Sequence, residues 1–306
     1  MSVRCFHWFA GLVFVIGPLP AYAGDKTGKS LYPRPLPEIR KTLGAILKFA
    51  DPKADDKTQA LRRLKAYRFL AGVPYEDLIL DEEYNQACLA GAKLCEKLGK
   101  SEHKPMNPGM PEAEFKLAYK GTSSSNLGRG HKSLVQAVDS WMDDSDDRNI
   151  DRLGYRRWCL NPSMAKTGFG RSGVFSAMYT FDRGRKTLVD YDFICWPARG
   201  YMPISFFGPK HAWNVSLNPA KYKAPGMDFT PKIYQADAKG AKKGKPLKLN
   251  YQRVDTVGFG IPNCIIFRPE NLALVSGARY VVELDGIEAQ AADGPAMLRY
   301  VVEFVN

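Results

Sequence analysis

The spacing of apolar residues predicts a helical first half of the chain. Between about residue 38 and residue 143, apolar positions recur every three or four residues, as in amphipathic helices. Asp81 is suited to cap the first turn of one helix and Gly99 to end it, and Ser133 suits the start of a later one. We therefore expect helices over residues 38–50, 56–71, 81–98 and 133–142.

Residues 100–130 interrupt this pattern. Pro105, Pro108, Gly109 and Pro111 precede a run of serines at 123–125. These residues favour turns, and long irregular segments inside compact domains are usually functional or tightly packed. We therefore expect an irregular loop here.

The pattern changes to strands after Lys166. Short β-branched and aromatic runs predict strands over 167–171, 174–182 and 188–196, with a turn at Gly184 before the last of them. Residues 197–203 have the composition of a boundary. Beyond it, further runs alternate with Pro and Gly turns, which is typical of a β-sandwich: 212–217, 231–236, 247–254, 264–268, 279–284 and 298–305.

The amino terminus has the layout of an export signal. Arg4 is the only charged residue before Asp25, an apolar run covers residues 9–18, and Ala-Tyr-Ala at 21–23 fits cleavage after Ala23. No second apolar run of that length follows, so we expect a secreted or periplasmic protein that is not integral to the membrane. The expected organisation is a signal peptide at 1–23, a linker and short helix at 24–55, and domains at 56–196 and 197–306.

The net charge of +12 favours anionic partners without choosing among polymers, lipid headgroups and cell-wall material. Four lysines cluster at a predicted hairpin tip over 238–245, which we interpret as a soluble turn or an anion-binding prong. No aromatic residue lies among these lysines, which argues against a nucleic acid partner.

Five cysteines follow the signal segment: Cys88, Cys95, Cys159, Cys195 and Cys264. An odd number leaves at least one thiol without a partner in the chain. Cys88 and Cys95 are about 10 Å apart along one predicted helix, too far for a disulfide, so we expect both to be buried thiols. Cys159 and Cys195 flank a β-rich stretch and are the candidate pair.

Five segments between Leu61 and Asp192 resemble the CAP superfamily of cysteine-rich secretory proteins, venom allergens and pathogenesis-related proteins. They occur in the family's order: LILDEEYNQACLAGAKLCEKLG, SEHKP, SSNLG, AVDSWMDD and GYRRWCLNPSMAKTGFG. The resemblance implies an α-β-α sandwich with a central cleft, so the chain is expected to be α+β, with a CAP-like domain before a C-terminal β-sandwich. In many members the cleft holds two histidines and two glutamates that bind a divalent metal.

The resemblance places four residues of this chain at those metal-binding positions. His103 matches the first histidine and Asp144 the second glutamate, with a shorter side chain. Ser125, beside Asn126, stands in place of the first glutamate, and Tyr155 in place of the second histidine. Neutral hydroxyls are weak ligands for zinc, so neither a metal nor another cofactor is expected.

Two adjacent arginines complete the set of cleft candidates. Arg156 and Arg157 are expected to point in opposite directions along a strand. One would pair with the acidic run 143–147, and the other would face the cleft and hold an anion.

The expected function is non-enzymatic recognition of a cell-envelope or extracellular ligand or partner protein. The alternatives are a hydrolase of peptide or glycan, built from Ser125, His103 and Asp144, and a carrier of sterol or lipid, which the resemblance allows. No Gly-x-Ser-x-Gly motif supports the hydrolase.

Overall fold

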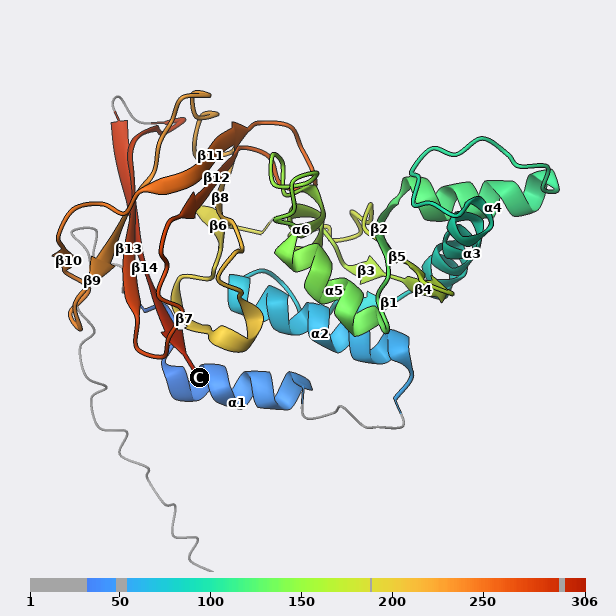
Figure 1. Ribbon diagram of the computed structural model, residues 1–306, viewed down its shortest axis with the longest axis horizontal. Coiled ribbons are helices and arrows are strands. Elements are labelled where there is room, and N and C mark those ends of the chain that lie inside the picture. Colours follow the sequence, from blue (N-terminus) through green and yellow to red (C-terminus); the bar gives the residue numbers. More distant parts are fainter. Residues whose placement is uncertain (1–31, 48–53, 188, 292–294) are drawn as a thin grey trace, which may run out of the picture.

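The computed structural model describes residues 32–47, 54–187, 189–291 and 295–306 (Figure 1). The expected signal peptide at 1–23 lies outside the described residues. Within the described part of the chain, none of the helices has both the length and the apolar character needed to cross a membrane.

The predicted helices are confirmed, and local capping explains where they begin and end. The Asp55 side chain accepts hydrogen bonds from backbone amides in the first turn of α2. In the same way, Asp81 accepts from the Tyr84 amide in α3, and Ser133 accepts from the Gln136 amide in α5. Gly72 and Gly99 end α2 and α3 in the left-handed conformation. The helices are α1 (Leu36–Leu47), α2 (Asp56–Ala71), α3 (Glu82–Leu98), α4 (Glu112–Ser123), α5 (Leu134–Asp143) and α6 (Gly154–Cys159), with a 3₁₀ turn η1 at Ile204–Phe206.

The expectation of an irregular segment at 100–130 was wrong, because α4 and a strand lie within it. α4 packs across α3 through small residues, and its buried positions are Ala118, Gly121 and Thr122. A Cβ added to Gly121 would lie 1.8 Å from the Ala87 carbonyl oxygen of α3. The helix therefore depends on close approach of its backbone to α3.

The first half of the chain forms an α-β-α sandwich. Its central sheet has the antiparallel order β2-β5-β4 and is built from β2 (Ser125–Arg129), β4 (Phe169–Ser172) and β5 (Phe175–Tyr179); β1 (Ile79–Leu80) pairs separately with β3 (Lys166–Thr167). Phe175 and Ala177 face Cys88 and Cys95 of α3, whereas Met178, on the opposite face, joins the core that includes Trp141 of α5. Figure 1 shows α3 on one side of this sheet and α2 and α5 on the other.

Two glycines near the start of β4 bring the sheet close to α3. A Cβ at Gly168 or Gly170 would lie 2.4 Å or 2.1 Å from the backbone of α3. The two glycines therefore allow the sheet to contact that helix directly.

The second half forms the expected β-rich module. One sheet has the order β10-β9-β13-β14-β7 and the other β11-β12-β8-β6. Trp213, Phe267, Tyr280 and Phe304 make ring contacts at about 6 Å in the core. The strands are β6 (Phe193–Trp196), β7 (Gly200–Pro203), β8 (Trp213–Leu217), β9 (Lys232–Ala236), β10 (Lys242–Lys243), β11 (Leu249–Asp255), β12 (Cys264–Pro269), β13 (Arg279–Glu288) and β14 (Pro295–Val305).

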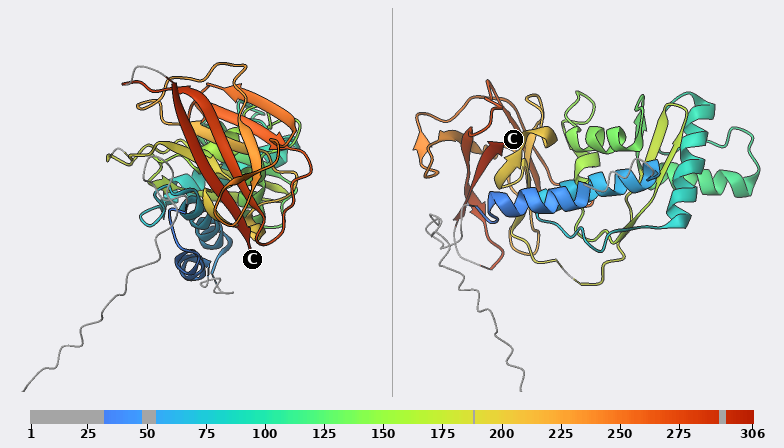
Figure 2. Two further views of the ribbon diagram at one scale, coloured as in Figure 1. Left: turned by 90° about the vertical axis from the view of Figure 1, so that its left-hand side faces the viewer. Right: turned by 90° about the horizontal axis from the view of Figure 1, so that it is seen from below.

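The two halves share one hydrophobic core. Tyr67 of α2 lies 5.3 Å from Trp196 of β6 and 5.1 Å from Phe206 of η1, between ring centroids. β6 precedes the expected boundary at Pro197 but pairs with β8, which follows it. The division into 56–196 and 197–306 stays a prediction, while the packing joins the halves along α1 and α2 (Figure 2).

The expected disulfide between Cys159 and Cys195 was wrong. All five cysteines of the described residues are buried and free. Cys159 lies in α6, where the Asn126 side-chain amide contacts its sulfur, and Cys195 lies in β6 of the second module. Cys88 and Cys95 are buried under the sheet, as expected.

Candidate functional site

The segment that carries the two arginines is a helix, so the expectation that they alternate along a strand was wrong. Both guanidinium groups are buried and neither lines a pocket. Arg156 donates to the carbonyl oxygens of Met142 and Asp143 at the end of α5, and to Ala212 O and Asn214 Oδ1 of the second module. It bonds the backbone of the acidic run rather than its carboxylates.

Arg157 holds the loop between β11 and β12 against α6. It donates to the carbonyl oxygens of Val257 and Ile261 and forms a salt bridge with Asp255. Its ring contact is Phe259, whose centroid lies 5.1 Å from the guanidinium carbon. The two arginines thus join the modules instead of holding an anion.

Asp144 is also outside the cleft. It ends α5 with φ 47°, and its Oδ2 accepts the amide protons of Tyr155 and Arg156 at 2.8 and 3.2 Å. Burial raises the pKa of this carboxyl well above its usual range. Asp144 therefore sets the position of α6, and its carboxylate does not line the pocket.

His103 and Tyr155 do meet in the cleft, joined by a hydrogen bond between Nε2 and the phenolic oxygen at 3.2 Å. The Nδ1 atom lies 3.0 Å from the Thr122 carbonyl oxygen, which can only accept, so Nδ1 carries the proton. Burial raises the pKa of Tyr155 to about 12, so its hydroxyl is protonated at neutral pH and can donate to Nε2. Both nitrogens of His103 are then occupied.

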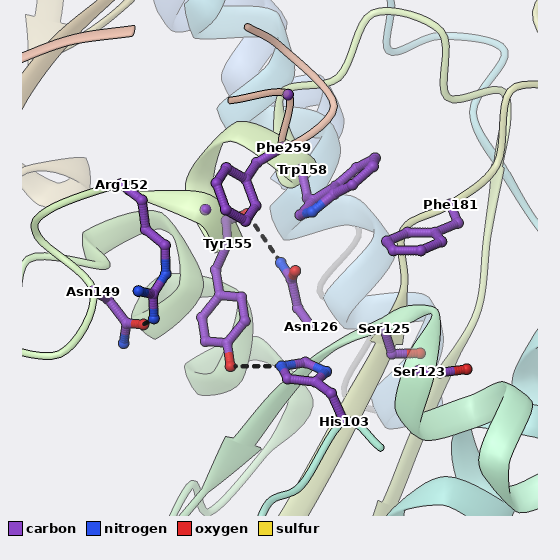
Figure 3. Close-up of a pocket in the computed structure, with 12 residues that line it drawn as sticks. His103, Ser123, Ser125, Asn126, Asn149, Arg152, Tyr155, Trp158, Phe181 and Phe259 are labelled. Atoms are coloured by element: carbon purple, nitrogen blue, oxygen red, sulfur yellow. Dashed lines mark hydrogen bonds between the residues drawn. The ribbon is translucent and has the colours of Figure 1, made fainter. Parts of the chain in front are cut away.

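Ser125 and Asn126 lie at the floor of the cleft, at the start of β2. Ser125 Oγ is 3.5 Å from Cys88 Sγ, and no hydrogen bond joins it to His103 among the described side chains. Asn126 is 1 % exposed and donates through Nδ2 to the Tyr155 carbonyl oxygen at 2.9 Å. Figure 3 shows its side chain between Tyr155 and the pair formed by Trp158 and Phe181.

These residues line a pocket of about 380 Å³ between the two modules (Figure 3). The second module contributes Gly258 and Phe259 from the β11–β12 loop. The aromatic lining is Tyr155, Trp158, Phe181 and Phe259, and the polar lining is His103, Ser123, Ser125, Asn126, Asn149 and Arg152.

Most of the aromatic residues that line the pocket were not predicted from the sequence. Trp158 is half-buried, with its ring centroid 4.6 Å from that of the exposed Phe181. Phe259 comes from a segment about one hundred residues further along the chain. The available signal was the Gly-Phe-Gly sequence at 258–260, an aromatic side chain on a turn that has no apolar period around it.

The residues at the four metal-binding positions do not fit a zinc site. His103 Nε2 faces the Tyr155 hydroxyl, and the Asp144 carboxylate is bound to backbone amides away from the pocket. Within the described ranges, no three His, Cys, Asp or Glu side chains come together as a metal-binding group.

Comparison with known proteins agrees with the fold. The model of the cysteine-rich secretory protein family, CAP, matches residues 61–181, which run from within α2 to just after β5. Comparisons with curated proteins and with solved structures returned no match. The matched residues contain the α-β-α sandwich apart from the start of α2, and every pocket residue except those of the β11–β12 loop. Residues 61–181 therefore form a CAP domain.

Proposed function

We propose that this chain is an exported, non-enzymatic binding protein that recognises a ligand of the cell envelope or extracellular space. The observation that carries the proposal is the pocket between the CAP domain and the β-module. Its volume of about 380 Å³ lies in the range of small-molecule sites, and its mixture of aromatic walls with a few polar groups is typical of them.

The lining supports binding rather than hydrolysis. Hydrolysis of a glycan by the common mechanism needs two carboxyl groups beside the scissile bond, and the pocket lining contains no Asp or Glu. A serine hydrolase needs a base in contact with its nucleophile. Ser125 contacts Cys88, and His103 is held by Thr122 and Tyr155.

A lipid carrier is less well supported, because half of the pocket lining consists of polar side chains. An acyl chain in this pocket would cover Asn126 and Ser125 without giving either a hydrogen bond.

Export rests on the pattern of residues 1–23. Mass spectrometry of the protein recovered outside the cytoplasm is expected to give Gly24 as the first residue. An intact amino terminus at Met1 in that fraction would contradict cleavage.

Ligand-observed NMR with a library of soluble glycan fragments, short peptides and fatty acids tests the binding function. Phe181→Ala is a suitable pocket variant because Phe181 is 47 % exposed, so the fold should tolerate the change. Phe229→Ala is a matched control, since Phe229 is half-buried in the second module and does not line the pocket. We expect binding that Phe181→Ala weakens and Phe229→Ala does not. The proposal fails if no compound binds in a way that depends on Phe181.

A further inference from the structure

We infer that the ligand of this pocket is a neutral saccharide, with a pyranose ring held among the four aromatic side chains and bound by Asn126. This inference rests on the proposed binding function and names the class of ligand. It follows from three properties of the pocket: its aromatic faces, an amide oxygen that accepts from no described residue and its lack of uncompensated charge.

The aromatic side chains lie on two sides of the pocket. In Figure 3, Tyr155 and Phe259 are on one side of Asn126, and Trp158 and Phe181 are on the other. Aromatic faces carry partial negative charge and attract the weakly positive C–H groups on the apolar face of a sugar ring. Partly exposed rings beside polar groups therefore suit a ligand that has one apolar face and many hydroxyls.

The wall from the second module is held in place before any ligand binds. The Phe259 ring packs over Gly154, where an added Cβ would lie 3.1 Å away, and over the Arg157 guanidinium group. Arg157 also fixes this loop through the Ile261 carbonyl oxygen at 2.8 Å. A preorganised wall lowers the entropy cost of binding.

Asn126 supplies an acceptor that the protein leaves unused. Its Nδ2 is occupied by the Tyr155 carbonyl oxygen, and no described residue donates to its Oδ1. Asn126 lines the pocket, so its amide oxygen can accept a hydrogen bond from a ligand there. A sugar hydroxyl can donate to Oδ1 and accept from another group at the same time, whereas an acyl chain provides no donor.

The charge of the lining favours a neutral sugar over an acidic one. Arg152 is the one permanently charged side chain of the lining. Its guanidinium group is already paired with Asp151 Oδ1 and with Asn149 Oδ1, both at 3.3 Å. A ligand carboxylate would have to compete with these partners.

Calorimetric titration of the full chain tests the inference. The saccharide probes are cellobiose, maltose and N,N′-diacetylchitobiose, and the comparison probes are decanoate and the dipeptide Gly-Phe. We expect at least one disaccharide to bind saturably, Phe181→Ala and Phe259→Ala to weaken it at least tenfold, and Phe229→Ala to change it less than twofold. Thermal unfolding of each variant verifies folding, and Phe181→Ala carries the test if Phe259→Ala does not fold.

The other outcomes separate the two proposals. Binding of decanoate or Gly-Phe, but of no disaccharide, with the same dependence on Phe181 and Phe259 would overturn the saccharide inference and leave the binding function standing. If no probe of any class binds in a way that depends on these residues, both are overturned.

Discussion

Arg157 allows the junction between the modules to be tested quantitatively. Its guanidinium group is 1 % exposed and holds the Asp255 carboxylate together with the carbonyl oxygens of Arg152, Val257 and Ile261. Arg157→Met keeps an unbranched side chain in the space but removes every donor. The Asp255 carboxylate, 13 % exposed, then loses its cation.

Removing one partner of a buried ion pair typically costs about 3–5 kcal/mol. Such a loss is a large part of the 5–15 kcal/mol that stabilises an ordinary domain. We expect Arg157→Met to lower the free energy of unfolding by about that amount and to loosen the loop that carries Phe259. Ligand binding should weaken as a consequence.

Equilibrium unfolding in urea measures this loss from the shift in midpoint at constant slope. Arg253→Met is the matched control, because Arg253 lies on the same hairpin with an exposed side chain, and should cost less than about 0.5 kcal/mol. Adding Asp255→Asn to Arg157→Met should recover part of the loss, since the unpaired charge is then gone. A cost below about 1 kcal/mol for Arg157→Met would refute the reasoning that this residue holds the junction.

Three further outcomes follow from the structure. Gly121→Ala should lower the unfolding free energy by at least about 1–3 kcal/mol, because its Cβ would lie 1.8 Å from a backbone oxygen of α3. Gly44→Ala, where the added Cβ meets nothing within 4 Å, should instead stabilise α1 by about 0.5–1 kcal/mol. Chemical denaturation measures both changes, and equal effects would contradict the close packing of α4 on α3. Burial lowers the pKa of His211 to about 4 despite the nearby Asp143. In the unfolded chain the pKa of this side chain is near 6.5, so as the pH falls the unfolded state binds the proton before the folded state does. Stability should therefore fall by up to about 3 kcal/mol as pH drops from 6.5 to 4, and His211→Gln should flatten this dependence in unfolding measured across pH; an unchanged slope would contradict it. Calorimetric titration with zinc should detect no binding that depends on His103. Saturable binding at one site that is lost in His103→Ala would contradict this and show that other residues complete a metal site in the cleft.

Local signals in the sequence were enough to locate most elements. α3 begins after Asp81 and ends before Gly99 as predicted, because a capping side chain and a left-handed glycine set the ends of a helix through contacts within one turn. Most strands of the second module were also predicted, since their apolar runs are separated by Pro and Gly turns, but β7 and β10 lie in segments that were expected to be a boundary and a hairpin tip. α4 was missed because the prolines and glycine that precede it and the serines at its end favour turns, and they determined the interpretation of residues 100–130.

The candidate site was only partly predictable. The resemblance placed His103 and Tyr155 at one cleft, and they do share a hydrogen bond. The positions of Asp144 and the two arginines were predicted wrongly because most of their partners are backbone atoms brought together by folding, at positions such as Ala212 and Ile261. Phe259 was missed for the same reason, since its place over the pocket depends on the contact between two modules.

The central claim is that both modules bind one ligand in one pocket. Nitrogen-15 NMR of the full chain, titrated with the disaccharide that binds most tightly in calorimetry, tests it most directly. We predict that the signals of the Asn126 side-chain amide, the Trp158 indole N–H and the Gly258 amide shift together along one saturation curve. Shifts confined to one module, or shifts only outside these three groups, would contradict the account.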